Sequence, residues 1–244
     1  MSSSCAAGES SSSATPTMSE TQHYNTVLDI DFDSLSLFGR GLRHFFENDS
    51  LADATIRCED KELKVHAVVC AAHSDYFMKA FCGPWKESKG DREMTLHEVD
   101  ADVVTALVQY MYHFDYKPPE NAYATVFHAK VYSLADRYQM PQLKQHSKKK
   151  FDSAMKKFWL HQQAGPISSE LFLALDEIYT STPDNDRGLR DIITRHCHNN
   201  KKLLETDTSF HMILREVPAL AVDMIFYHPF DHLFPGSKGL PLFP

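Results

Sequence analysis

The chain has 244 residues and a mass of 27.8 kDa, enough for one large domain or two small ones. Hydrophobic residues make up 43% and charged residues 24%, so the chain can bury a core, while its short apolar runs exclude a membrane helix. The net charge of −8 argues against a dedicated polyanion binder.

The first part of the chain predicts a tail, a helix and a hairpin. Residues 1 to about 22 are mostly Ser, Ala, Thr and Gly, so we expect a disordered tail. Large apolar residues at helical spacing predict the first helix over Gly41 to Asn48. Residues 54–58 and 62–65 then alternate between apolar and polar side chains across a polar turn, which is typical of a hairpin.

Helices dominate the rest of the sequence. Ser74 is predicted to cap a short helix, and Asp100 to cap an amphipathic helix that follows a third strand at residues 94–96. Two long helices are expected next, over 122–139 and 143–159, with a proline between them.

The helical pattern continues after residue 165. One apolar stripe begins at Leu171, and Thr182-Pro183-Asp184 is predicted to cap the following helix. Residues 210–214 and the apolar run 220–226 favour further helical segments, whereas 229–244 is rich in Pro and Gly and is expected to be irregular.

Five cysteines, an odd number without a C-x-x-C pair, favour a reducing compartment over a disulfide framework. The amino terminus also lacks the pattern of a secretory signal, so we expect an intracellular protein of the cytoplasm, the nucleus or both. Cys58, Cys70 and Cys82 lie on apolar faces and are expected to be buried.

Fourteen histidines raise the question of a metal or catalytic site. The densest group, His196-Cys197-His198, has the wrong spacing, because ligands on one helix face need i, i+3 or i+4. We favour structural roles there and at His66, which lies at a strand-to-helix junction. The chain also shows no G-x-S-x-G, H-E-x-x-H or phosphate-binding glycine loop. We therefore expect no enzyme, metal or cofactor, and a hydrolase is the least favoured alternative.

One basic run extends from Lys144 to Lys157. It is either a patch for nucleic acid or an acidic partner, or the solvated face of a helix. We favour the solvated face, including Lys144 and Lys148, because Phe151 and Met155 lie on the opposite side.

Several segments of the chain follow an order that is typical of one family. They are the start of a strand at 51–56, a strand-to-helix motif from Leu63 to Phe77, a helix and loop from Val104 to Tyr116, and the junction of two helices from Val131 to Leu143. Together they resemble the BTB/POZ domain, over about Phe38 to Trp159. Residues from Leu171 to Phe226 resemble the helical tail of many fungal BTB proteins.

The resemblance implies an α/β (α+β) fold with a small three-stranded sheet flanked by a cluster of helices, followed by an all-helical extension. It also implies a protein-interaction module that forms a homodimer. Many members dock a cullin scaffold as substrate adaptors of cullin-RING ubiquitin ligases, and others act in transcriptional repression. A direct nucleic-acid or membrane partner is not expected.

The resemblance also suggests roles for particular residues. Those expected at the dimer interface are Leu42, Phe45, Phe46 and Asp53. Those expected to dock a partner are Tyr112, His113, Phe114 and Tyr116. Those expected in the structural core are His66, Ser74, Phe77, Phe81, Leu107 and Leu134.

Two departures from the family pattern matter. Tyr112-His113-Phe114 stands where Tyr-Thr-Gly is usual, and because Phe resists a positive φ we expect a different turn beside the cullin-docking surface. Asp53 matches an acidic residue that lines a charged pocket in some dimeric members. Its usual basic partner is replaced by Ala67, so that pocket is not expected to carry over.

The favoured function is thus a self-associating protein-interaction module, most concretely a cullin-RING substrate adaptor with an unknown substrate or regulatory protein. The alternative is a transcriptional or chromatin co-regulator that acts through protein contacts, since the chain has no zinc-finger or other DNA-reading motif. The predicted segments are a Ser-rich tail at 1–22, a BTB/POZ domain at 38–159, a helical extension at 166–228 and an irregular tail at 229–244.

Overall fold

The computed structural model describes residues 32–46, 48–83, 92–162 and 169–227, so the predicted tails at 1–22 and 229–244 lie outside it. The chain separates into two units, residues 1–37 and 38–244, and the contacts below are within the second. Among the described residues, no helix combines the length and apolar character needed to cross a bilayer.

The first helix differs from its prediction. Helix α1 (Phe32–Arg43) begins before Gly41 and ends before the two phenylalanines that were assigned to it. From His44 to Phe46 each backbone amide bonds to the carbonyl three residues earlier, which makes tight turns in place of the α-helical pattern. Phe45 and Phe46 are therefore presented by a turn.

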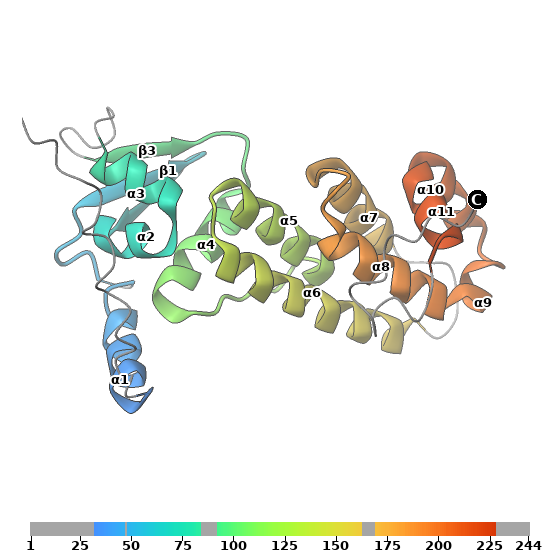
Figure 1. Ribbon diagram of the computed structural model, residues 1–244, viewed down its shortest axis with the longest axis horizontal. Coiled ribbons are helices and arrows are strands. Elements are labelled where there is room, and N and C mark those ends of the chain that lie inside the picture. Colours follow the sequence, from blue (N-terminus) through green and yellow to red (C-terminus); the bar gives the residue numbers. More distant parts are fainter. Residues whose placement is uncertain (1–31, 47, 84–91, 163–168, 228–244) are drawn as a thin grey trace, which may run out of the picture. The chain divides into compact units, whose positions relative to one another are not determined.

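A small sheet carries the first core. Its strand order is β2-β1-β3, formed by β1 (Ala54–Cys58), β2 (Lys61–Val65) and β3 (Glu93–Leu96). β1 pairs antiparallel with β2 and parallel with β3, and all its side chains except that of Arg57 are buried. Helices α2 (Ala67–His73) and α3 (Asp75–Cys82) form part of the connection from β2 to β3 (Figure 1).

Two predicted helix caps are confirmed. The Ser74 hydroxyl accepts from the amide of Phe77 at 3.2 Å and starts α3, and it also donates to the Tyr138 carbonyl at 2.5 Å. The Asp100 carboxylate accepts from the amide of Asp102 at 3.0 Å, which satisfies one of the unpaired donors of the next helix.

The remaining elements are helical, as Figure 1 shows. They are α4 (Ala101–His113), α5 (Ala124–Arg137), α6 (Pro141–His161), α7 (Ser169–Ser181), α8 (Arg187–Asn199), α9 (Lys201–Leu204), α10 (Thr208–Glu216) and α11 (Pro218–Ile225). The sheet with its surrounding helices confirms the predicted fold class. The short helix α9 was not predicted.

The predicted cap of α8 is wrong. The Thr182 hydroxyl donates to the Ile178 carbonyl at 2.6 Å, so it closes the last turn of α7. Asp186 caps α8 by accepting from the amide of Gly188 at 2.9 Å. Thr and Asp are both common at the first position of a helix. The Thr182 hydroxyl is already bonded at the end of α7, so Asp186 caps α8 instead.

Helix α5 contributes to two hydrophobic cores. Phe127 and Val131 pack in the first core, with the sheet and helices α2 to α4. Ala129 and Tyr132 pack in the second core, with α6 and helices α7 to α11. The predicted boundary near residue 159 stays a prediction, and the second core extends across it.

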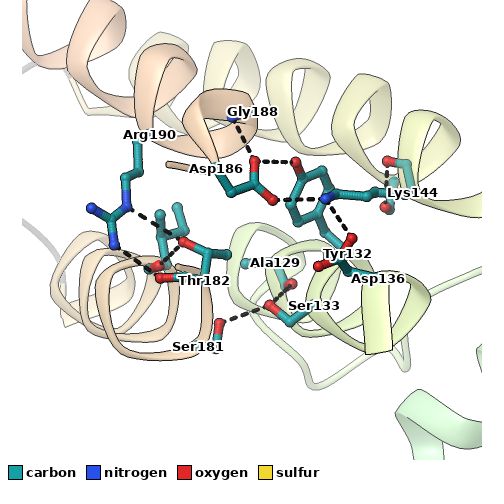
Figure 2. Close-up of polar contacts among 12 residues, drawn as sticks. Ala129, Tyr132, Ser133, Asp136, Lys144, Ser181, Thr182, Asp186, Gly188 and Arg190 are labelled. Carbon is teal, nitrogen blue, oxygen red and sulfur yellow. Dashed lines mark hydrogen bonds and ion pairs between the residues drawn. The ribbon is translucent and has the colours of Figure 1, made fainter. Parts of the chain in front are cut away.

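A polar cluster joins α5 and α6 to α8 within this second region. Asp186 accepts from the Tyr132 hydroxyl at 2.7 Å and lies 2.7 Å from the amine of Lys144 (Figure 2). The same amine contacts Asp136 at 2.7 Å. We call Tyr132, Asp136, Lys144 and Asp186 the junction cluster. Lys144 is therefore not on a solvated face, and the prediction for this lysine is wrong.

The prediction for the cysteines is correct for Cys58 and Cys70 and wrong for Cys82. Helix α3 buries Phe77 and Phe81, and the next residue along the helix points about 100° away from Phe81. Cys82 is therefore exposed.

Candidate interaction surface

A buried histidine and tyrosine form the base of the surface. The backbone amide of His66 donates to the Tyr112 hydroxyl oxygen at 2.9 Å, and that hydroxyl lies 2.8 Å from His66 Nδ1. The hydroxyl has one proton, which it can give to Nδ1, so Nε2 carries the imidazole hydrogen and donates to the Ser50 carbonyl at 3.0 Å. This network joins the end of α4 to the start of α2.

Two aromatic rings from the turn after α1 lie on this base. The Phe45 ring is 5.3 Å from the ring of His66, and the Phe46 ring is 5.8 Å from that of Tyr112. Phe46 is half-buried against the first core, as is Leu42, whereas Phe45 is exposed. The module thus covers part of this apolar surface itself and leaves Phe45 open.

The loop after α4 holds Phe114 at a positive φ. Phe114 has φ 56° and ψ 19°, which is left-handed, and its amide bonds to the Tyr110 carbonyl at 2.9 Å. This conformation costs a non-glycine residue about 1–2 kcal/mol. The Phe114 ring lies 5.5 Å from the ring of His73. Phe114 thus takes the positive φ that a phenylalanine resists, with aromatic rings beside it, and the expectation that this turn differs from the family's stays a prediction.

Two of the four predicted docking residues are buried, which corrects their role. Tyr112 and Tyr116 are each 1% exposed, so their side chains cannot meet a partner directly. Burial raises the pKa of both hydroxyls. Tyr116 bonds to His128 Nδ1 at 2.9 Å, and it therefore positions the loop from beneath. His113 and Phe114 remain accessible.

Helix α6 fixes the other end of the loop. Asp115 lies 2.7 Å from the amine of Lys150 and 2.9 Å from His146 Nε2. Burial alone would raise the pKa of Asp115, but the hydrogen bonds from Lys150 and His146 outweigh it and lower the pKa to about 2. Lys150 also donates to the Tyr116 carbonyl at 2.8 Å. The loop is held on both sides of Phe114.

Asp53 has partners within its own chain. Its carboxylate accepts from the amide of Ala67 at 2.8 Å and forms an ion pair with Arg92, which directly precedes β3. Arg92 takes the place of the basic partner that is missing after His66, because the parallel pairing of β1 with β3 brings it beside Asp53. Sequence alone did not reveal this pair, because it depends on the strand register.

One predicted dimer residue, Phe46, lies beside one predicted docking residue, His113. The Phe46 ring lies 5.0 Å from the ring of His113, and Gly39 of α1 passes beside Phe114, since a Cβ there would be 3.7 Å from that ring. We call Phe45, Phe46, His113 and Phe114 the aromatic surface. The residues predicted for the core are all buried; they are His66, Ser74, Phe77, Phe81, Leu107 and Leu134.

The aromatic surface lies within a segment that matches a known family. Residues 42–154, less than half of the chain, match the family model of the BTB/POZ domain. This segment is similar to BTB/POZ domains. Kelch-like protein 40 of Xenopus tropicalis is 29% identical over 108 residues, and Kelch-like protein 21 of Danio rerio is 35% identical over 109 residues. The human Kelch repeat and BTB domain-containing protein 4 is 31% identical over 97 residues.

These matches cover 40–44% of this chain and 16–17% of the relatives, so the chain spans about a sixth of the length of the curated relatives it matches. The solved BTB domain of human gigaxonin is 17% identical, with a TM-score of 0.40, covering 52% of this chain and 98% of that one. The BTB domain of zebrafish PATZ1 is 16% identical, with a TM-score of 0.39, covering 50% of this chain and 95% of that one. The relatives named here are vertebrate, and the likeness of the helical extension to fungal proteins stays a prediction.

Proposed function

We propose that this protein is a non-enzymatic protein-interaction module that forms a homodimer through Phe45 and Phe46 of its aromatic surface and docks a partner through His113 and Phe114. Within that role, the proposed activity is that of a substrate adaptor for a cullin-RING ubiquitin ligase. The BTB/POZ match and the Kelch-like relatives support the general role. The cullin partner rests on the family resemblance, and the substrate would be a further, unidentified protein.

The observation that carries the proposal is the rigid support under exposed aromatic side chains. Phe45 is 36% exposed and Phe114 is 49% exposed, although their neighbours His66 and Tyr112 are buried and hydrogen-bonded. Binding at such a place loses little conformational freedom, because the side chains beneath are already ordered. Aromatic anchors of this kind often dominate the affinity of an interface.

Self-association is tested by Phe45→Asp in the full chain, measured by light scattering coupled to size exclusion. We expect a wild-type dimer at tens of micromolar and a monomeric variant, because the interface would bury a carboxylate without a counter-charge. Met212→Asp on α10 is the matched control, since Met212 is 64% exposed and far along the chain from the aromatic surface. A monomeric wild-type protein, or a Phe45→Asp protein that stays dimeric, would refute the dimer.

Cullin docking is tested separately with Phe114→Asp and a purified cullin scaffold in a titration. We expect this variant to bind at least about tenfold more weakly than wild type, the usual effect of losing an aromatic hot spot. Phe45→Asp should keep the affinity per chain. Absence of micromolar binding by the wild-type protein would exclude the adaptor role and leave the dimer standing.

A further inference from the structure

The imidazole of His73 lies against the turn that presents Phe114. His73 is the last residue of α2, and its Nε2 lies 2.9 Å from the carbonyl oxygen of Met111. Its ring is 5.5 Å from the ring of Phe114 and 5.9 Å from that of Tyr110. One half-buried side chain of α2 therefore contacts both the backbone and the exposed ring of this turn.

The hydrogen bond from His73 completes the end of α4. The last carbonyls of a helix have no partner within the helix, because no further turn follows. The Tyr110 carbonyl accepts from the amide of Phe114, and the Met111 carbonyl accepts from His73. The α-helical partner of Met111 would be Asp115, which lies beyond the end of α4. His73 thus helps to hold the left-handed turn at Phe114 from a separate helix.

The bond also decides the protonation state of the ring. A carbonyl oxygen only accepts, so Nε2 carries the hydrogen, and in the neutral ring Nδ1 carries none. Burial lowers the pKa of His73 and outweighs the opposing effect of the bond to Met111. His73 is therefore neutral at pH 7, and acid adds a proton and a positive charge at Nδ1.

The groups that face His73 do not offer a counter-charge. From α4 the titratable group is Tyr110, which stays neutral because burial raises its pKa. From α3 the nearby charged residues are Asp75 and Lys79, both exposed, and neither contributes to the shift in the pKa of His73. On the far side of Tyr110, His146 of α6 is bonded to the carboxylate of the loop. Among the described residues, no carboxylate contributes to the pKa of His73.

We propose that His73 makes docking at Phe114 sensitive to pH, because the neutral imidazole permits docking and the imidazolium opposes it. This inference rests on the proposed docking of a partner through His113 and Phe114. A partner that covers the Phe114 ring removes water from the imidazole beside it. An imidazolium that loses water without gaining a counter-charge raises the free energy of the complex. Docking therefore favours the neutral ring and releases a proton in acid.

The proposal is tested by titrating the full chain with a purified cullin scaffold at pH values from 8 to 5.5. His73→Gln is the decisive variant, because its amide can still donate to the Met111 carbonyl but does not titrate. The ratio of the wild-type to the variant dissociation constant cancels the titration of the scaffold and of His128, which both proteins share. We expect this ratio to be constant near pH 8 and to rise in acid, by at most about tenfold per pH unit.

His97→Asn is the control, because His97 is exposed and directly follows β3, and it should keep the wild-type pH profile. A ratio that stays constant from pH 8 to 5.5 would overturn the role of His73 and leave docking standing. Loss of the pH dependence in His146→Gln, with His73→Gln like wild type, would also overturn it. Absence of binding by the wild-type protein at pH 8 would instead refute the docking itself, and this inference with it.

Discussion

At the scale of single residues, acid should weaken this protein through His128. Its pKa is about 4 when folded and near 6.5 in an unfolded chain, so between these values the unfolded state binds more protons. The free energy of unfolding should therefore fall as the pH drops from about 6.5 to 4, by a total on the order of 2–3 kcal/mol from this group.

The measurement is urea unfolding at a series of pH values. His128→Asn should flatten the curve over this range, because an amide can still bond to Tyr116 but does not titrate. His73 and His196, whose pKa values are also lowered by burial, keep their own contributions. The exposed His97→Asn is the control and should leave the slope unchanged. Equal slopes in His128→Asn and wild type would contradict the assignment.

Phe114 allows the cost of a left-handed residue to be measured. In an ordinary helix, Ala is more stable than Gly by about 1 kcal/mol. At φ 56° the order should reverse, so Phe114→Gly should be more stable than Phe114→Ala by about 1 kcal/mol in urea unfolding. Both variants lose the same ring contacts, so the comparison isolates the backbone. If Ala is the more stable, the turn does not have this conformation in solution.

At the scale of elements, Gly188 lets α8 approach α5. A Cβ at Gly188 would lie 2.0 Å from the Tyr132 hydroxyl oxygen and 3.0 Å from the Asp186 carboxylate, so the junction cluster would have to move apart. Gly188→Ala should therefore destabilise the protein by about 1–3 kcal/mol, although Ala is normally the better helix residue. Thermal unfolding measures the effect.

Gly41→Ala is the control for that prediction, because a Cβ there meets nothing within 4 Å. It should be neutral or stabilise the protein by up to about 1 kcal/mol. Tyr132→Phe in the Gly188→Ala background should recover part of the loss, since it removes the oxygen that clashes. Equal melting temperatures for the two alanine variants would show that α8 does not pack on Tyr132 in this way.

At the scale of the whole molecule, the features predicted from sequence are those that depend on neighbouring residues. Ser74 and Asp100 cap their helices through amides two or three residues away, so a short window is enough to find them. The hairpin follows from alternation and a polar turn, and the parallel strand β3 from a short apolar pattern.

The features missed are those that the tertiary fold creates. The pair of Asp53 with Arg92 needs the register of β1 with β3. The contact of Lys144 with Asp186 needs α8 to lie against α6, and a helical pattern alone places that lysine toward solvent. The same limit applies to the bond between Tyr116 and His128, which joins the loop after α4 to α5.

The division of buried residues between two cores has a practical consequence for thiol chemistry. Cys70 lies in the first core and Cys197 in the second, both are 0% exposed, and burial raises the pKa of each to about 12. Neither can react with a thiol reagent until the surrounding core opens. The labelling rate of each cysteine therefore reports how often its own core opens.

Helix α5 belongs to both cores, and the junction cluster joins α8 to it. We therefore expect Cys70 and Cys197 to be labelled at the same rate in mild denaturant. Mass spectrometry of the labelled peptides assigns each rate to its cysteine. Gly188→Ala should speed both rates together. Faster labelling of Cys197 alone would mean that the second core opens by itself while the first core stays closed.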